Sequence, residues 1–194
     1  MLLSRARDGS DEALGQLLDG YRNYLMLLGR TQISRKLRIR LGASDLVQET
    51  LAKAYQHFPD FNGNTEQELT AWLRKILIRQ LINAAQQHHG PVRDMRREQS
   101  LQTSLERSSL SIHDALADSI ATPSEQVSRR EQVVLVANAM AELPDDYREV
   151  LMGRHIDGQS FAQIAKRMDR SPGAVRMLWL RALEKLNRLL ENQQ

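Results

Sequence analysis

The stretch SFAQIAKRMDRSPGAVRMLWLRALEKL, residues 160–186, decides the fold of the C-terminal part of the chain. Its first half has apolar side chains at helical spacing, namely Phe161, Ile164, Ala165 and Met168. These side chains predict one buried face of a short helix that Ser160 caps. A second helix is expected to begin at Pro172 with Ser171 as its N-cap, because proline fits the first helical position, where no backbone donor is needed. The stretch therefore predicts a helix-turn-helix.

The second helix of this pair has an apolar face and a basic face. The inward positions are Val175, Trp179, Ala182, Leu186 and Leu189. The outward positions that can contact DNA are Arg170, Ser171, Gly173, Arg176, Met177 and Arg181. Such a face fits the major groove, where arginine binds a guanine edge or a phosphate and glycine permits close approach. The alternative is a helical hairpin whose arginines are only solvated.

The remainder of the 194-residue chain also has the helical period, and we find no strand pattern and no repeat. Helices are expected over residues 11–29, 44–58, 65–88, 128–143, 145–155, 160–168 and 172–191. Residues 99–127 are rich in Ser, Thr and Gln, a composition that buries little and suits a tether. We therefore expect an all-α fold with two small helical domains, 1–98 and 131–194, and a linker over 99–130.

Charge and composition favour a nucleic-acid partner and an intracellular location. The formal net charge is +3, and residues 1–99 carry 15 Lys/Arg against 11 Asp/Glu, while residues 131–194 carry nine of each. A basic excess in the front half suits a polyanion. The chain has no cysteine, no signal-peptide pattern and no run of 18 apolar residues. We expect a cytoplasmic protein that does not bind a membrane.

No residue pattern predicts an enzyme, a metal site or a cofactor. Ser160 and Ser171 have no credible base with an orienting acid, and the sequence lacks a Walker-type glycine loop. His88 and His89 are adjacent, but no further ligands have suitable spacing for a metal ion. We expect none of the three.

Residues 141–186, AELPDDYREVLMGRHIDGQSFAQIAKRMDRSPGAVRMLWLRALEKL, resemble domain four of the sigma-70 family in its extracytoplasmic-function group. The matching positions are Leu143-Pro144, Tyr147 to Leu151, Gly158, Ile164-Ala165, Ser171, Gly173 to Arg176 and Arg181-Ala182. This resemblance implies that the helix-turn-helix binds the minus-35 promoter element. The chain departs from most members at Met177-Leu178-Trp179, a variant similar to planctomycete-type members.

Residues 44–61, SDLVQETLAKAYQHFPDF, resemble the polymerase-binding helix of domain two of that family. Helical spacing turns Val47, Leu51, Phe58 and either Ala54 or Tyr55 inward. The outward residues are Asp45, Gln48, Glu49 and Lys53, and the resemblance implies that they bind core RNA polymerase. Without the resemblance, the alternative is a solvated polar face with Asp45 in the favourable first turn.

Residues 61–101 are similar to the minus-10 region of the same family. The expected core stripe is Trp72, Leu73, Ile76, Leu77, Gln80 and Leu81. The residues expected to bind minus-10 DNA are Asn62, Arg74, Lys75, Arg79, Arg93, Arg96 and Arg97, with a pocket for a flipped base in the loop 59–65. Asn83 and Gln86 depart from the aspartate and arginine that related members often have.

Both resemblances together predict a sigma factor of the extracytoplasmic-function type. Core RNA polymerase and promoter DNA are then its partners, and an anti-sigma factor is a further partner that the resemblance allows. The alternative is a stand-alone helix-turn-helix regulator, which would bind duplex DNA without polymerase.

Overall fold

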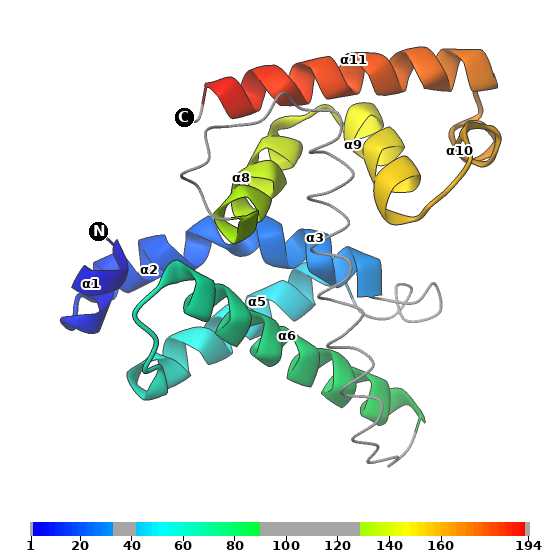
Figure 1. Ribbon diagram of the computed structural model, residues 1–194. Coiled ribbons are helices and arrows are strands. Elements are labelled where there is room, and N and C mark those ends of the chain that lie inside the picture. The colour runs from blue at the N-terminus through cyan, green and yellow to red at the C-terminus, as the bar shows by residue number, and fades with distance from the viewer. Residues whose placement is uncertain (1, 33–41, 90–128, 193–194) are drawn as a thin grey trace. The chain divides into compact units, whose positions relative to one another are not determined.

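The computed structural model describes residues 2–32, 42–89 and 129–192, and every regular element among them is helical (Figure 1). The all-α prediction is thus confirmed for the described ranges. The chain divides into two compact units, the first containing the described residues up to 89 and the second containing those from 129. None of the described helices is long and apolar enough to cross a membrane.

The first unit contains five α-helices and one 3₁₀ turn among its described residues. They are α1 (Leu2–Arg7), α2 (Asp11–Gly20), α3 (Arg22–Gln32), α5 (Ala43–His57), η1 (Phe58–Asp60) and α6 (Glu66–His89). The helix predicted over residues 11–29 is in fact two helices. α2 ends at Gly20, a residue of low helix propensity, and the Tyr21 amide then bonds the Leu18 carbonyl at 3.1 Å. Sequence analysis did not find α1, which buries Leu3 and Ala6 and packs on α2.

The core of the first unit lies between α5 and α6, and α3 packs against both of these helices. Val47 and Ala54 on α5 and Leu73 and Leu77 on α6 are fully buried. Of the two alternatives left by helical spacing, Ala54 points inward and Tyr55 is exposed. A hydrogen bond to Asp11 of α2 raises the pKa of the Tyr55 hydroxyl, with smaller contributions from burial and the Asp11 charge. Tyr55 therefore lies outside the core, on the side of α5 that faces Asp11 of α2.

The buried arc of α6 is wider than the predicted stripe. The stripe residues Leu73, Ile76, Leu77, Gln80 and Leu81 are buried as expected, and Trp72 is half-buried. A second row, Thr70, Arg74 and Ile78, is buried as well, because α6 packs against both α5 and α3. The prediction that Arg74 lies on the outer, DNA-facing side was therefore wrong, since the residue is only 8% exposed.

The second unit contains four α-helices and a π-helical turn among its described residues. They are α8 (Arg129–Glu142), α9 (Asp145–Leu151), the turn η2 (Met152–Ile156), α10 (Phe161–Met168) and α11 (Pro172–Glu191). The long α11 packs against α8, α9 and α10. The core of the second unit includes five fully buried side chains, Val150, Ile164, Val175, Ala182 and Leu186.

Arg148 of α9 closes the C-terminal end of α8. Its Nε donates to the Met140 carbonyl at 3.0 Å, and one terminal nitrogen donates to the Ala141 and Leu143 carbonyls at 2.8 and 2.7 Å. The other terminal nitrogen donates to Asp145 at 2.9 Å. The last carbonyls of a helix lack partners within the helix, and this guanidinium bonds two of them, Met140 and Ala141, together with the Leu143 carbonyl just beyond the end of α8. Arg148 therefore connects the end of α8 to α9.

We predict that Arg148→Ala lowers the free energy of unfolding of the second unit by about 1–3 kcal/mol, because part-buried carbonyls lose their donors. Hydrogen exchange at the Val150 and Val175 amides of the intact chain measures this quantity. Arg188→Ala is the matched control, since the only side-chain partner of Arg188 among the described residues is the exposed Glu184 on the same helix. Equal effects of the two substitutions would contradict the capping role.

Candidate nucleic-acid interface

The turn between α10 and α11 is defined by backbone bonds and two serine caps. Ser160 and Gln163 form a reciprocal capping box at the start of α10, with bonds of 3.3 and 2.8 Å. At its end Asp169 has a left-handed backbone, φ 53°, and the Arg170 amide bonds the Ala165 carbonyl at 3.0 Å. Ser171 then accepts the Ala174 amide at 3.2 Å. Both serine caps and the Pro172 start of α11 are confirmed.

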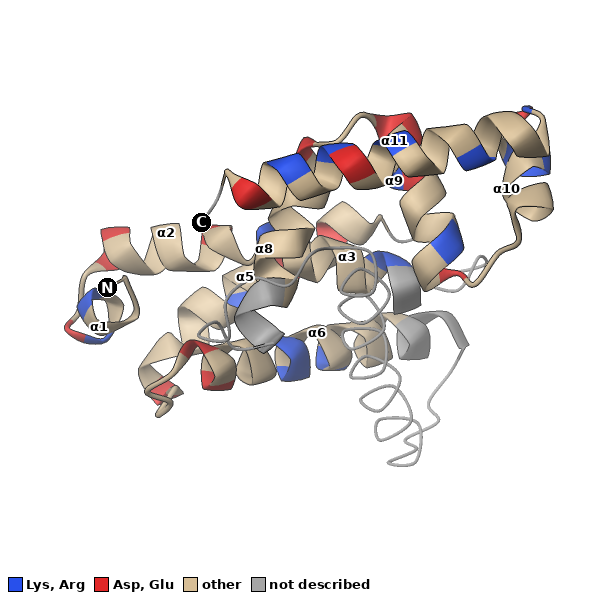
Figure 2. Ribbon diagram, turned by 45° about the horizontal axis from the view of Figure 1, so that its top comes forward, with Lys and Arg blue, Asp and Glu red and all other residues tan. Residues whose placement is uncertain are grey.

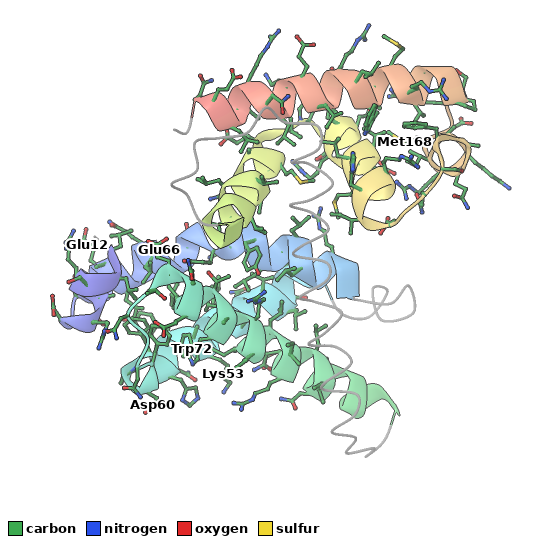
Figure 3. The ribbon with its side chains drawn as sticks, viewed as in Figure 1. Glu12, Lys53, Asp60, Glu66, Trp72 and Met168 are labelled. Carbon is green, nitrogen blue, oxygen red and sulfur yellow. The ribbon has the colours of Figure 1, made fainter. Side chains whose placement is uncertain are left out.

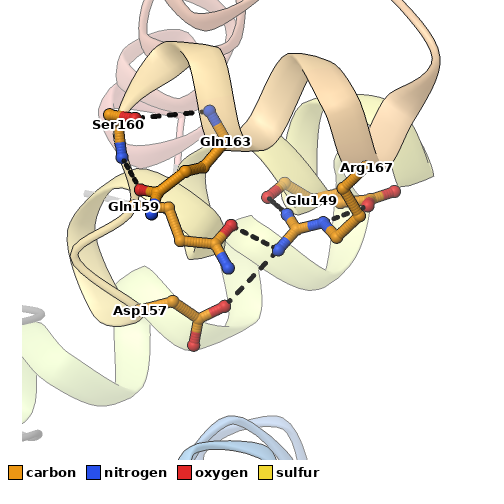
Figure 4. A network of polar contacts seen from close by, with 6 residues as sticks. All are labelled: Glu149, Asp157, Gln159, Ser160, Gln163 and Arg167. Carbon is orange, nitrogen blue, oxygen red and sulfur yellow. Dashed lines mark hydrogen bonds and ion pairs between the residues drawn. The ribbon is translucent and has the colours of Figure 1, made fainter.

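Arg167 fastens α10 to α9 and to the loop before α10 (Figure 4). Its guanidinium donates to the Glu149 carboxylate at 2.9 Å and to the Gln159 side chain at 2.5 Å. It also lies 3.7 Å from Asp157. Gly153 leaves room for this group, because a Cβ there would stand 2.8 Å from an Arg167 nitrogen and 3.1 Å from Ile164. A side chain at position 153 would therefore push the Arg167 guanidinium away from its present position.

Trp179, on the buried side of α11, makes both a polar contact and a packing contact within the second unit. Its Nε1 donates to His155 Nε2 at 3.0 Å, and its ring meets Phe161 edge-on at 5.6 Å. Indole nitrogen is only a donor, so His155 is neutral here with its proton on Nδ1. Burial lowers the pKa of His155, and the nearby Arg154 lowers it further. Trp179, at which the sequence departs from the family pattern, thus faces the core of the second unit and bonds His155.

The outer side of α11 carries the predicted DNA-contacting residues. Arg170, Ser171, Gly173, Arg176, Met177 and Arg181 are all exposed. On the opposite side Val175, Ala182 and Leu186 are buried, while Trp179 and Leu189 are half-buried. The structure therefore places this predicted set on one accessible surface, which we call the α11 outer face.

Two of the arginines near this face already have partners within the unit. The Arg170 guanidinium bonds Asp146 of α9. The Arg176 guanidinium lies over the Phe161 ring, 5.5 Å from its centroid, and Arg154 lies over the same ring at 5.1 Å. Sequence analysis missed Arg154, because its approach to Phe161 depends on the π-helical turn, which no helical spacing indicates. The Phe161 ring thus holds two arginines at the start of α10.

The predicted polymerase-binding residues of α5 also lie on one accessible surface. Asp45, Gln48, Glu49 and Lys53 are exposed, while Val47, Leu51 and Ala54 on the other side are buried. We call these four residues the α5 outer face. It has the amphipathic division that the sequence predicted.

The loop from Pro59 to Thr65 is held by an aromatic cluster and by a cap. Phe61 lies 5.8 Å from Phe58 and 5.1 Å from Trp72, measured between ring centroids. Figure 3 shows Trp72 where α6 passes the end of α5 and the turn that carries Asp60. Trp72 thus packs against other rings, as predicted. Gly63 fits tightly, because a Cβ there would stand 2.3 Å from the Phe61 ring.

A carboxylate closes the other end of this loop. Glu68 accepts the Asn64 and Thr65 amides at 2.8 and 3.1 Å, and these bonds with the Thr65 hydroxyl lower the pKa of Glu68. Arg7 of α1 donates to the Asn64 side chain. Asn62, the residue predicted to contact DNA, stays exposed at the tip and bonds only the Asp60 carbonyl, at 3.3 Å, within the described contacts.

The basic surface of α6 is smaller than predicted. Figure 2 shows acidic residues at the start of α6 and basic residues further along it. Lys75 and Arg79 are exposed and one helical turn apart, whereas Arg74 is buried, as described above. Arg93, Arg96 and Arg97 lie outside the described residues, as does the predicted tether over residues 99–127. In the described ranges no group of three or more His or acidic side chains could hold a metal ion.

Comparisons with known proteins match both units. The model of sigma-70 region 2 matches residues 21–89, and that of sigma-70 region 4 matches residues 134–186. The ECF RNA polymerase sigma-E factor of Haemophilus influenzae is 28% identical over 194 residues, covering 99% of this chain and 93% of that protein. The RNA polymerase sigma-H factor of Pseudomonas aeruginosa is 28% identical over 190 residues, covering 98% and 92%. The structure of CnrH in complex with the cytosolic domain of CnrY aligns at 21% identity over 100% of this chain and 97% of that one, with a TM-score of 0.33.

The two matched regions together span more than half of the chain, in the order in which the sequence placed them. The chain belongs to the sigma-70 family. It is an RNA polymerase sigma factor of the extracytoplasmic-function group, as its relatives over nearly the whole length indicate.

We predict that the stability of the second unit falls as His155 is protonated. The pKa of His155 is lower in the folded than in the unfolded protein, so the unfolded state takes up the proton first as the pH falls. The contribution of His155 should be level above about pH 7 and should decrease below about pH 6.5, the ordinary histidine pKa.

Hydrogen exchange at the Val175 amide between pH 5 and 7.5 checks this prediction against His155→Gln, which cannot titrate but keeps an acceptor for Trp179. The loss of stability on acidification should be smaller in the variant. His57→Gln, a substitution in the first unit, is the control. Identical pH profiles for the wild type and His155→Gln would show that the Trp179 contact does not depend on neutral His155.

Proposed function

We propose that the two units divide promoter recognition between them within one polymerase holoenzyme. The first unit binds core RNA polymerase and the minus-10 element, and the second unit binds the minus-35 element. The α11 outer face is the observation that carries this proposal, because it presents three arginines and a bare glycine on one exposed side of a helix whose opposite side is buried. A helix of this kind can enter the major groove without disturbing its own core.

The α5 outer face is the proposed polymerase contact. Asp45 and Glu49 stand at i and i+4, so their like charges do not stabilise α5 itself. Among the described residues neither carboxylate takes part in an ion pair, and both are accessible. Two accessible carboxylates with Gln48 between them suit a basic helical surface on the partner.

The proposed minus-10 contact joins the loop 59–65 to the exposed basic residues of α6. Lys75 and Arg79 can follow the phosphates of a separated strand. The Phe58, Phe61 and Trp72 cluster fixes the base of the loop, so Asn62 at its tip is presented by a preorganised backbone. A flipped base captured beside Asn62 would stabilise the open strand.

The same proposal includes domain boundaries at 1–98 and 131–194, with residues 99–130 as the linker. The matched family regions fall inside these bounds. A linker makes the second promoter contact intramolecular, so two weak contacts reinforce each other. The chain itself supplies binding and is not an enzyme, because sigma factors act as non-catalytic initiation factors. An anti-sigma factor remains a predicted partner without assigned residues.

We predict that Arg176→Ala weakens holoenzyme binding to the minus-35 element. A lost base contact should cost about 1–3 kcal/mol and relax preference at one position, whereas a lost phosphate contact should weaken binding almost uniformly. Competition binding on duplexes substituted at each upstream position separates these two results. Arg188→Ala, near the far end of α11, is the control. Unchanged binding and unchanged transcription would remove Arg176 from the interface.

We predict that the triple substitution Asp45→Ala, Gln48→Ala and Glu49→Ala weakens the affinity for core polymerase. Each exposed replacement should change the free energy of unfolding by about 0.5 kcal/mol or less, so the fold is retained. Glu12→Ala with Gln16→Ala on α2 is the matched control, because those two exposed side chains pair only with each other among the described contacts. If the triple variant competes for core polymerase as well as the wild type, the α5 outer face is not the contact.

A further inference from the structure

Two large apolar side chains on α11 are left uncovered by the fold. Met177 is 51% exposed and Leu180 is 47% exposed, and they stand three residues apart. The other exposed large hydrophobic side chains among the described residues, Leu2 and Tyr55, are less exposed, and both belong to the first unit. Both side chains are therefore available to a partner, and Met177 belongs to the α11 outer face.

Gly173 adds an independent observation on the same side of the helix. It precedes Met177 by four residues, and a Cβ built at Gly173 would meet nothing within 4 Å. Its φ is not positive and no neighbour excludes a side chain, so the fold alone would accept alanine, which favours a helix more than glycine does. Side chains on a helix lean toward its N-terminus, so Met177 leans over this open position. Gly173 and Met177 thus lie one helical turn apart on the exposed side of α11, with open space over Gly173.

The surroundings of Gly173 and Met177 favour DNA as the partner of this side of α11. Arg170, Ser171 and Arg176 are close to them in sequence near the start of α11, and all three are exposed. Arginines in such positions suit the phosphates on either side of a groove. Among the base edges in the major groove, thymine alone presents an apolar group, its C5 methyl, which apolar side chains recognise.

We propose that Met177 reads a thymine of the upstream promoter element, with the thymine methyl seated over Gly173 against the methionine side chain. The inference rests on the proposed entry of α11 into the major groove. It adds a base identity that the arginines do not specify, because Arg176 selects guanine or a phosphate. Met177 is then a specificity-determining residue of this chain.

The test uses holoenzyme reconstituted with the intact chain and a duplex that this holoenzyme selects from a randomised pool. Each thymine of the upstream element is replaced singly by deoxyuridine, which removes only the methyl group. One replacement should weaken binding about fourfold, the factor expected for burial of one methyl group. In Met177→Ser the thymine and deoxyuridine duplexes should bind equally, whereas Met177→Leu should retain most of the preference.

Gly173→Ala provides the second readout, since it should raise the thermal stability of the second unit while weakening binding to the thymine duplex. A deoxyuridine series without any effect, or an effect that survives in Met177→Ser, would overturn the inference. A selected upstream element that contains no thymine would also overturn the inference. If the deoxyuridine replacements have no effect and Met177→Ser lowers the affinity for core polymerase, Met177 contacts a protein partner instead of DNA. Loss of upstream binding in Arg176→Ala alongside a flat series would leave the proposed function standing and remove only the thymine contact.

Discussion

The orientation of α11 depends on the short turn that separates it from α10. Asp169 reverses the chain in the left-handed conformation, and Ser171 with Pro172 starts the next helix two residues later. So short a connection leaves α11 little freedom, and the buried Ile164 and Val175 then hold the two helices together. This constraint sets the rotation of α11 about its own axis. The rotation that buries Val175 also exposes the arginines of the α11 outer face.

The turn is supported from behind by three sets of polar contacts, which connect α8, α9, the π-helical turn, α10 and α11. Arg167 joins α10 to α9, Arg148 joins α9 to α8, and Trp179 joins α11 to the π-helical turn through His155. Each arginine satisfies several acceptors at once, so removing either would leave polar groups without partners. The first unit uses different means for the same purpose, since rings and the tight fit of Gly63 hold its loop. Both units thus present exposed polar residues on rigid supports.

Features that depend on residues close in sequence were predictable, whereas features that depend on packing between separate helices were not. The caps at Ser160 and Ser171 were correct because a side chain and an amide three residues away decide them. The all-α class and the amphipathic faces followed from helical spacing for the same reason. Arg74 was placed wrongly because one stripe cannot show that α6 is covered by two helices. Arg154 was not found because a π-helical turn brings it to Phe161.

As a sigma factor, this chain is expected to recognise promoters only as a part of RNA polymerase. Footprinting on one selected promoter, with the chain, core polymerase and their mixture compared, distinguishes this from binding by the chain alone. We expect protection of both promoter elements and permanganate-reactive thymines in the minus-10 element only with the mixture, because strand opening needs the polymerase and both units. Equal protection by the chain without polymerase, with no opened thymines in the mixture, would instead indicate a stand-alone helix-turn-helix regulator.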